Sequence, residues 1–144
     1  MFAQLVWAGS LIAITVVVQA MFMSAGLRHL KSMEDHQHPL FTRRPTIVVV
    51  LWVLFLTVPV AIDVILWATL FRLRGAVPNF EDALYFSTVT FTTVGYGDIV
   101  LDRGSRLLAT CEAVNGWIIF GWATAFVMIV IQRLYLPGTA GAPK

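Results

Sequence analysis

The sequence predicts an all-α membrane protein with three membrane-spanning helices, and a short re-entrant helix and loop between the second and third. The chain has 144 residues, of which 58% are hydrophobic and 12% charged, against about a quarter charged in an ordinary soluble domain. Residues 1–27 and 113–132 carry no charge, and Asp63 is the only charged residue in 45–71. Each block is about 20 residues or longer, enough for a helix to cross a hydrocarbon core of ~30 Å.

Composition excludes several function classes. A net charge of +2 offers no basic stripe for nucleic acid. The single cysteine, Cys111, has no partner within the chain, which argues against a disulfide scaffold. The sequence shows no nucleophile–base pair of an enzyme, and we expect no organic cofactor.

The first helix is expected over about 2–27, followed by a basic end that completes an N-terminal segment 1–33. We interpret this helix as retained, because no lysine or arginine precedes Arg28 and the apolar run exceeds the ~7–15 residues of a signal-peptide core. A loop is expected over 34–45.

The second helix is expected over 46–71, after Pro45 at its first position, where a missing N–H costs nothing. Pro59 predicts a kink. Asp63 is expected to face protein, because a charged side chain in hydrocarbon costs about 2.5–3.5 kcal/mol on insertion scales.

The stretch between the second and third helices is too short and too polar to span, yet it is rich in aromatic residues. Asn79 and Asp82 resemble an N-cap pair and predict a short helix over 80–91. In the loop that follows, Gly95 and Gly97 permit positive φ, so that successive carbonyl groups can point the same way. Such backbone is tolerated at membrane depth only where it is buried in protein or lines water.

The third helix is expected over 103–136, because Pro137 and Gly138 stop it, which leaves a tail at 137–144.

The loop sequence Thr93-Val94-Gly95-Tyr96-Gly97 is that of the potassium-channel selectivity filter. Residues 46–136 therefore resemble the pore domain of the tetrameric potassium channel family, with an outer helix (46–71), a pore helix (80–91), a filter (93–97) and an inner helix (103–136). The resemblance implies a homotetramer around a central pore. It also implies passive K⁺ conduction, with K⁺ ions held by backbone carbonyls and by the Thr93 hydroxyl.

The chemistry of the loop agrees with this resemblance. Neutral carbonyls suit a weakly hydrated monovalent cation, whereas a divalent-ion site favours carboxylates, and Asp98 lies just past the filter. The C-terminus of the pore helix would also place partial negative charge near the ion.

Filter support is expected from residues on both sides of the loop: Tyr85, Phe86, Thr92 and Asp98. The Tyr96 ring would pack against Tyr85 or Phe86, and Asp98 would hydrogen-bond behind the filter. Some bacterial relatives partner this aspartate with a pore-helix glutamate, but Val89 takes that position here.

In the inner helix, Gly116, Phe120 and Thr124 share a face and are candidates for the cavity or gate. A hinge and a close-packing role for Gly116 are both open.

Two buried carboxylates are candidates for tuning the ion path. Glu112 is interpreted as a structural hydrogen-bond partner of Thr88 or Thr90, with tuning of permeation as the alternative. For Asp63, a link to the pore helix or to the first helix is preferred to an ion-coupling role.

Two further residues, His36 and His38, lie beside acidic residues in the first loop. They are weak candidates for binding a transition metal or sensing pH, and a solvated loop is the simpler interpretation.

The resemblance places the pore loop on the outside. The chain is then a multi-pass protein of the cell membrane with its N-terminus outside and its C-terminus cytoplasmic, and the count of basic residues agrees weakly. Expected partners are further copies of the chain and membrane lipid, and a separate regulatory subunit is left open. The alternative function is a non-conducting or regulatory membrane subunit of another channel.

Overall fold

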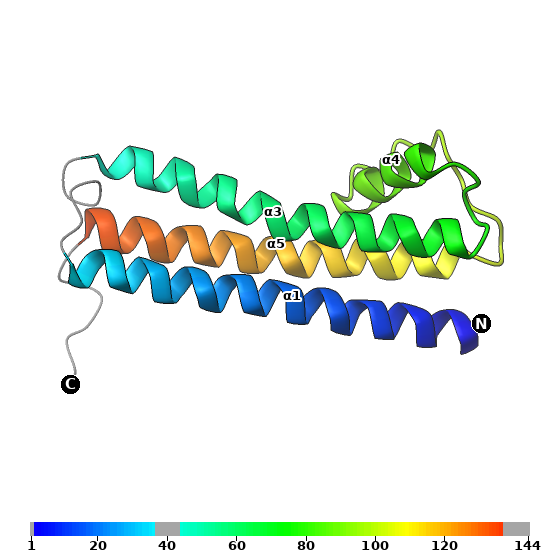
Figure 1. The fold of residues 1–144 in the computed structure, drawn as a ribbon. Helices are drawn as coiled ribbons and strands as arrows, with labels where there is room; N and C mark the ends of the chain where they lie inside the picture. Colours follow the sequence, from blue (N-terminus) through cyan, green and yellow to red (C-terminus); the bar gives the residue numbers. More distant parts are fainter. Residues whose placement is uncertain (1, 37–43, 137–144) are drawn as a thin grey trace.

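The computed structural model describes residues 2–36 and 44–136, which form four helices in these ranges and no strand. They are α1 (Phe2–Asp35), α3 (Pro45–Leu73), α4 (Phe80–Phe91) and α5 (Arg106–Tyr135) (Figure 1). The three long helices have the length and composition to cross a membrane. The predicted fold class of an all-α membrane protein is therefore confirmed.

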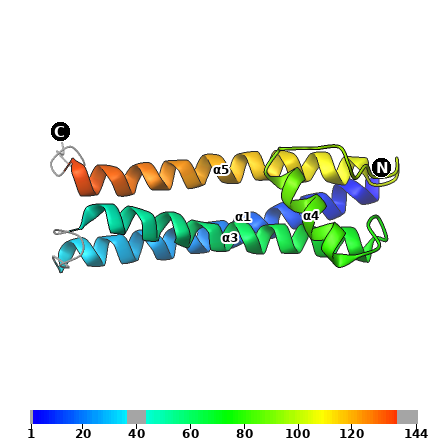
Figure 2. The same ribbon diagram turned by 90° about the horizontal axis from the view of Figure 1, so that it is seen from above.

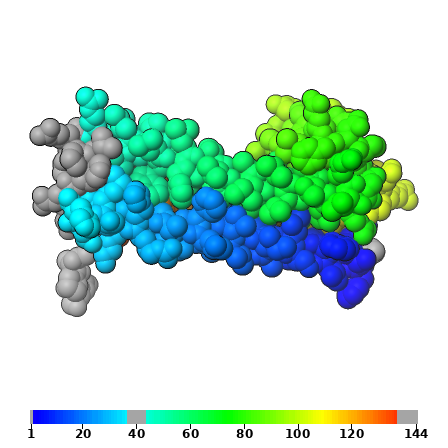
Figure 3. Space-filling view, viewed as in Figure 1, coloured from blue at the N-terminus to red at the C-terminus, as the bar shows by residue number. Residues whose placement is uncertain are grey.

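The long helices form an elongated bundle in which α1 and α5 run in one direction and α3 in the other (Figures 1 and 2). The short helix α4 lies beside the C-terminal half of α3 and the first part of α5. It stands out from the bundle at the end that holds the N-terminus (Figure 3). The α3 ribbon changes direction near its middle, and this helix contains Pro59, the residue expected to kink it.

Helix α1 is longer than the sequence predicted, because it continues from residue 27 to Asp35. Leu30 is fully buried in an apolar cluster with Trp52 of α3 and Phe126 of α5. One turn further on, Glu34 forms an ion pair with Arg133 at 2.8 Å. Tertiary contacts therefore hold this polar stretch in the helix, so the expected loop begins later than residue 34.

Helices α1 and α5 pack in a constant register along the bundle. Contacts join Gln4 to Gly104, Thr15 to Asn115 and Gly26 to Phe126, always 100 positions apart. The buried residues of α1 recur every eleven positions, as Gln4, Ala8, Thr15, Gln19, Gly26 and Leu30. An eleven-residue repeat is typical of helices that coil around each other with a right-handed twist.

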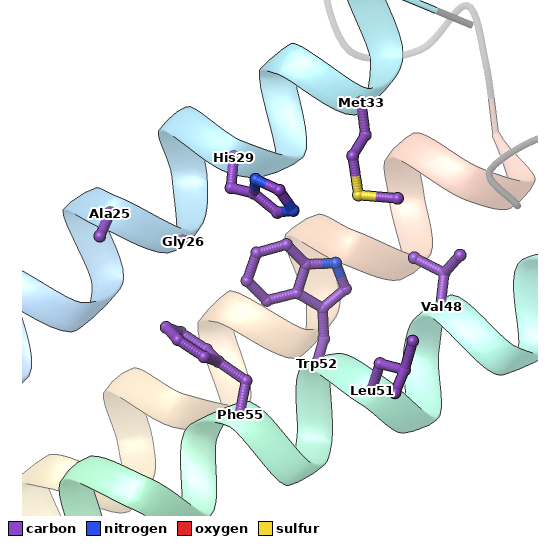
Figure 4. Close-up of a pocket in the computed structure, with 8 residues that line it drawn as sticks. All are labelled: Ala25, Gly26, His29, Met33, Val48, Leu51, Trp52 and Phe55. Atoms are coloured by element: carbon purple, nitrogen blue, oxygen red, sulfur yellow. The ribbon is translucent and has the colours of Figure 1, made fainter. Parts of the chain in front are cut away.

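Apolar side chains gather in two clusters, one around α4 and the other toward the opposite end of the bundle. Beside the second cluster, α1 and α3 border an open pocket of about 450 Å³ (Figure 4). Its lining is apolar except for His29, whose ring lies next to the Trp52 indole at a centroid distance of 6.0 Å. None of its lining residues belongs to α4 or to the loop after it.

Helix α4 begins where the sequence predicted. Asn79 occupies the N-cap position with extended backbone, and its side-chain amide donates to the Asp82 carboxylate at 3.0 Å. No side-chain bond caps the backbone there, so the pair holds the first turn through side chains alone.

Candidate functional site

The C-terminus of α4 leads directly into the 93–97 segment. The Thr93 amide donates to the Thr90 carbonyl at 2.9 Å, and the Val94 amide donates to the Val89 carbonyl at 3.0 Å. Together these bonds form a Schellman motif, in which the residue after the cap adopts left-handed backbone. Thr93 holds this position with a φ of 60°. Glycine is the usual residue there, and a β-branched residue is a strained exception.

The sign of φ alternates through the whole 93–97 segment. It is positive at Thr93, Gly95 and Gly97, with values of 60°, 56° and 77°, and it is not positive at Val94 or Tyr96. Backbone that alternates between the two hands turns successive like groups toward one side. The conformation therefore favours a row of carbonyl groups along one side of the segment.

These carbonyl groups are not used inside the chain. Within the two described ranges, no hydrogen bond ends on a carbonyl oxygen of residues 93–97. The segment is also exposed in a single chain, since Val94 is 53% and Tyr96 72% accessible. Backbone acceptors need partners wherever water is excluded. The row is therefore available to a ligand.

Asp98 is held by the tyrosine at the middle of α4. The Tyr85 hydroxyl donates to Asp98 Oδ2 at 2.7 Å, and the Ile99 amide donates to Asp98 Oδ1 at 3.1 Å. The bond from Tyr85 lowers the pKa of Asp98 and raises the pKa of Tyr85 itself. Tyr85 thus supports the loop through its hydroxyl, whereas the sequence suggested only its ring.

The other predicted support residues lie around the same helix. Phe86 is buried and packs edge-to-face on Phe71 of α3, with ring centroids 5.1 Å apart. Thr92 donates its hydroxyl to the Thr88 carbonyl at 2.7 Å. The Tyr96 ring makes no ring contact with Tyr85 or Phe86 within the described part of one chain.

On α5, Gly116 lies where the inner helix crosses the end of α4. A Cβ atom there would overlap the Phe91 carbonyl oxygen and lie 2.8 Å from its carbon. Of the two roles left open by the sequence, this geometry favours close packing. Phe120 contacts the Phe91 ring, and with Thr124 it borders a cavity of about 340 Å³ between α3 and α5.

Glu112 is fully buried, and its partner is Ser87 of α4, whose hydroxyl lies within hydrogen-bonding distance of Oε1. The pore helix was the expected partner, but Thr88 was the wrong residue, because its hydroxyl donates to the Leu84 carbonyl of its own helix. Thr90 makes no hydrogen bond to Glu112 either. The rotation of α4 about its axis turns Ser87 toward α5.

Asp63 is also fully buried, and neither carboxylate oxygen has a hydrogen-bond partner in the described residues. The expected link from Asp63 to the pore helix or the first helix is therefore not seen. Val64, which follows Asp63, links α3 to α4 instead, because its carbonyl accepts a 2.9 Å hydrogen bond from Ser87.

Of the two candidate histidines, His36 and His38, the structure describes only His36. His36 donates its ring N–H to the Ser32 carbonyl at 2.8 Å, and His38 lies outside the described residues. In residues 2–36 and 44–136, no three metal-ligating side chains gather. The metal site stays a weak prediction.

Sequence reasoning missed three polar residues that join helices here. Ser87 is fully buried, and Thr15 of α1 accepts a 2.8 Å hydrogen bond from Asn115. The sequence signal for Thr15 was a polar residue eleven positions after Gln4 in a mostly apolar run.

Comparison with known proteins supports a transport function. Over 41 residues, the chain is 49% identical to two-pore potassium channel 4 and 54% identical to two-pore potassium channel 1, both from Arabidopsis thaliana. Over 55 residues, it is 38% identical to a hyperpolarization-activated voltage-gated potassium channel of Methanocaldococcus jannaschii. These alignments cover 28%, 28% and 37% of this chain, and 14%, 11% and 26% of the relatives' own lengths.

No solved structure matches the chain. A profile of the ion channel family matches residues 47–133, which is more than half of the sequence. This match includes α4, the 93–97 segment and nearly all of α3 and α5. The family assignment made from the filter motif is confirmed: the chain belongs to the ion channel family.

Proposed function

We propose that this membrane protein is a potassium-selective channel that conducts K⁺ passively through a ring of backbone carbonyls. One observation carries the proposal: five consecutive residues alternate in the sign of φ, and their carbonyl oxygens accept no hydrogen bond in the described chain. Three relatives that are named as potassium channels support the choice of ion.

The proposed ligands are the carbonyls of Thr93, Val94, Gly95 and Tyr96, with the Thr93 hydroxyl at one end. Removing water from a monovalent cation is costly unless other oxygens replace it. Neutral oxygens fit an ion that must also leave again, because conduction needs binding weak enough for release. The carboxylate that follows the segment in sequence, Asp98, accepts a hydrogen bond from Tyr85.

A single chain supplies one wall of such a site, so the proposal requires symmetric copies, and the family resemblance implies four. Large apolar residues on α5 are exposed in one chain, including Trp117 at 73% and Val114 at 56%. In the proposed homotetramer, these side chains meet neighbouring subunits or line the central cavity. The loop between α4 and α5 is assigned to the outside, which places the end of α5 in the cytoplasm.

Ion flux into liposomes tests the proposal. We expect the purified protein to pass K⁺ or Rb⁺ at least tenfold faster than Na⁺. Gly95→Ala should abolish the flux, because its positive φ strains any residue with a side chain. The matched control is Gly9→Ala on α1, where a Cβ atom meets nothing and φ is helical.

Each alternative has its own result. Equal K⁺ and Na⁺ flux would refute selectivity, and a flux that survives Gly95→Ala would refute the path. A folded oligomer that passes no cation would favour the non-conducting subunit.

A further inference from the structure

Ser87 connects three helices behind the 93–97 segment. Its hydroxyl oxygen lies 2.9 Å from the Val64 carbonyl oxygen of α3 and within hydrogen-bonding distance of Glu112 Oε1 of α5. Ser87 and Glu112 are both fully buried. Both side chains are removed from bulk solvent, so the three oxygens share the protons that the two side chains carry.

The number of protons available to the two contacts of Ser87 decides whether Glu112 is charged or neutral. A serine hydroxyl has one proton to donate, and a backbone carbonyl can only accept. If Ser87 donates that proton to Glu112, a lone pair of the Ser87 oxygen faces a lone pair of the Val64 carbonyl oxygen, and the two repel each other. If that proton goes to Val64, Glu112 must supply the proton for its own contact with Ser87. Both contacts are satisfied only when the carboxyl group is neutral and donates.

The surroundings of Glu112 agree with a neutral acid. Among the sequence neighbours of the three bonded groups, the titratable residues are Asp63 on α3, next to Val64, and Cys111 on α5, next to Glu112. The nearest arginine along α5, Arg106, donates its Nε–H to the Leu101 carbonyl at 3.0 Å. In the described ranges, Glu112 forms no ion pair and its Oε2 has no partner. A charged carboxylate left in this way would be poorly compensated.

We infer that Glu112 is held as the neutral acid and donates its proton to Ser87, and that this bond makes it a positioning residue for the pore helix. The positioning role rests on the proposed channel function, whereas the protonation state does not. Glu112 and Gly116 lie one turn apart on α5 and touch Ser87 and Phe91, which lie one turn apart on α4. Two contacts on one face therefore set the depth and rotation of α4, whose last turn leads into Thr93.

Infrared spectroscopy of the full chain in lipid at neutral pH tests the protonation state. We expect a carboxylic-acid C=O band in the wild type that disappears in Glu112→Gln. In Ser87→Ala the band should move to higher frequency, because the acid loses its acceptor. Asp63→Asn is the control, since Asp63 is the other buried carboxyl group. A spectrum in which no acid band is lost on Glu112→Gln would overturn the inference.

Ion selectivity tests the positioning role. Glutamine keeps a neutral donor of similar shape, so Glu112→Gln should keep the K⁺/Na⁺ flux ratio within twofold of the wild type. Glu112→Leu and Ser87→Ala should each lower the ratio at least fivefold while the oligomer stays intact. Thr88→Val is the matched control, because Thr88 bonds only to its own helix.

The arms of this experiment separate the possible failures. A glutamine variant as impaired as the leucine variant would show that charge is required, which overturns the inference. Full selectivity in an intact leucine variant would overturn the positioning role. If that variant does not fold, Ser87→Ala decides by the same criterion. If the wild type passes no ions, the channel proposal fails but the protonation state of Glu112 does not, because the infrared measurement does not depend on ion conduction.

Discussion

Tyr85 and Asp98, thirteen residues apart, are joined by a 2.7 Å hydrogen bond that ties the middle of α4 to the loop beyond the 93–97 segment. The pore helix and the far end of the segment are thereby fixed to each other, so the segment between them is held at both ends.

Tyr85→Phe should remove this restraint. The pKa of Asp98 is lowered mainly by the Tyr85 bond, so the bond stabilises the fold above the ordinary pKa of 3.8 and is lost as pH falls through the lowered pKa. In the variant, the pKa of Asp98 should rise toward 3.8, measured by NMR of labelled aspartate. The control is Tyr135→Phe, whose hydroxyl contacts Thr46 far from the loop. An unchanged titration of Asp98 would contradict the prediction.

Gly116→Ala should loosen the contact between α5 and α4. The added methyl group overlaps the Phe91 carbonyl, and overpacking of this kind costs about 1–3 kcal/mol. At Gly121 on the same helix, an added Cβ atom meets nothing. Gly121→Ala should therefore raise stability, because alanine has the higher helix propensity. Thermal unfolding in detergent measures both. Equal midpoints for the two variants would show that Gly116 is not a packing position.

Thr93→Gly should stabilise the fold and impair its function. Left-handed backbone costs a residue with a Cβ atom about 1–2 kcal/mol, which glycine avoids. The same change removes the hydroxyl that the proposed channel uses as an ion ligand. We therefore expect a higher unfolding midpoint together with a lower K⁺/Na⁺ flux ratio. Thr92→Gly serves as the control, because the φ of Thr92 is −78° and glycine relieves nothing there.

Thr15→Val should weaken the attachment of α1. The variant keeps the shape of the side chain but leaves the buried Asn115 amide without its acceptor. Hydrogen bonds between membrane helices contribute about 0.6 kcal/mol on average and up to about 1.7 kcal/mol. Stability should fall within that range in denaturation experiments in bicelles. Ser24→Ala, which removes an exposed hydroxyl bonded only to its own helix, should change little.

Much of the fold could be predicted because it depends on local sequence. The length of the apolar runs gave the three spanning helices, and the cap residues before α4 gave its start. The continuation of α1 beyond residue 27 could not be predicted, because it depends on the burial of Leu30 and on the pairing of Glu34 with Arg133. Arg133 lies 99 residues after Glu34, and part of the cluster around Leu30 belongs to α5, far along the chain.

The candidate site shows the same division. The composition of the loop predicts a row of carbonyl groups, since glycines alternate with other residues. The partner of Glu112 depends on how far α4 is rotated about its axis, and that rotation follows from packing. Thr88 or Thr90 was therefore expected in place of Ser87. The role of Gly116 was decided by one backbone oxygen on another helix.

The constant offset between α1 and α5 bears on how the chain moves. Contacts at four depths join α1 to α5 or to the turn just before it, and they include a buried polar pair and an ion pair. Contacts at four depths restrict the sliding of α1 along α5. A tilt or rotation of α5 would therefore be transmitted to α1 through these contacts.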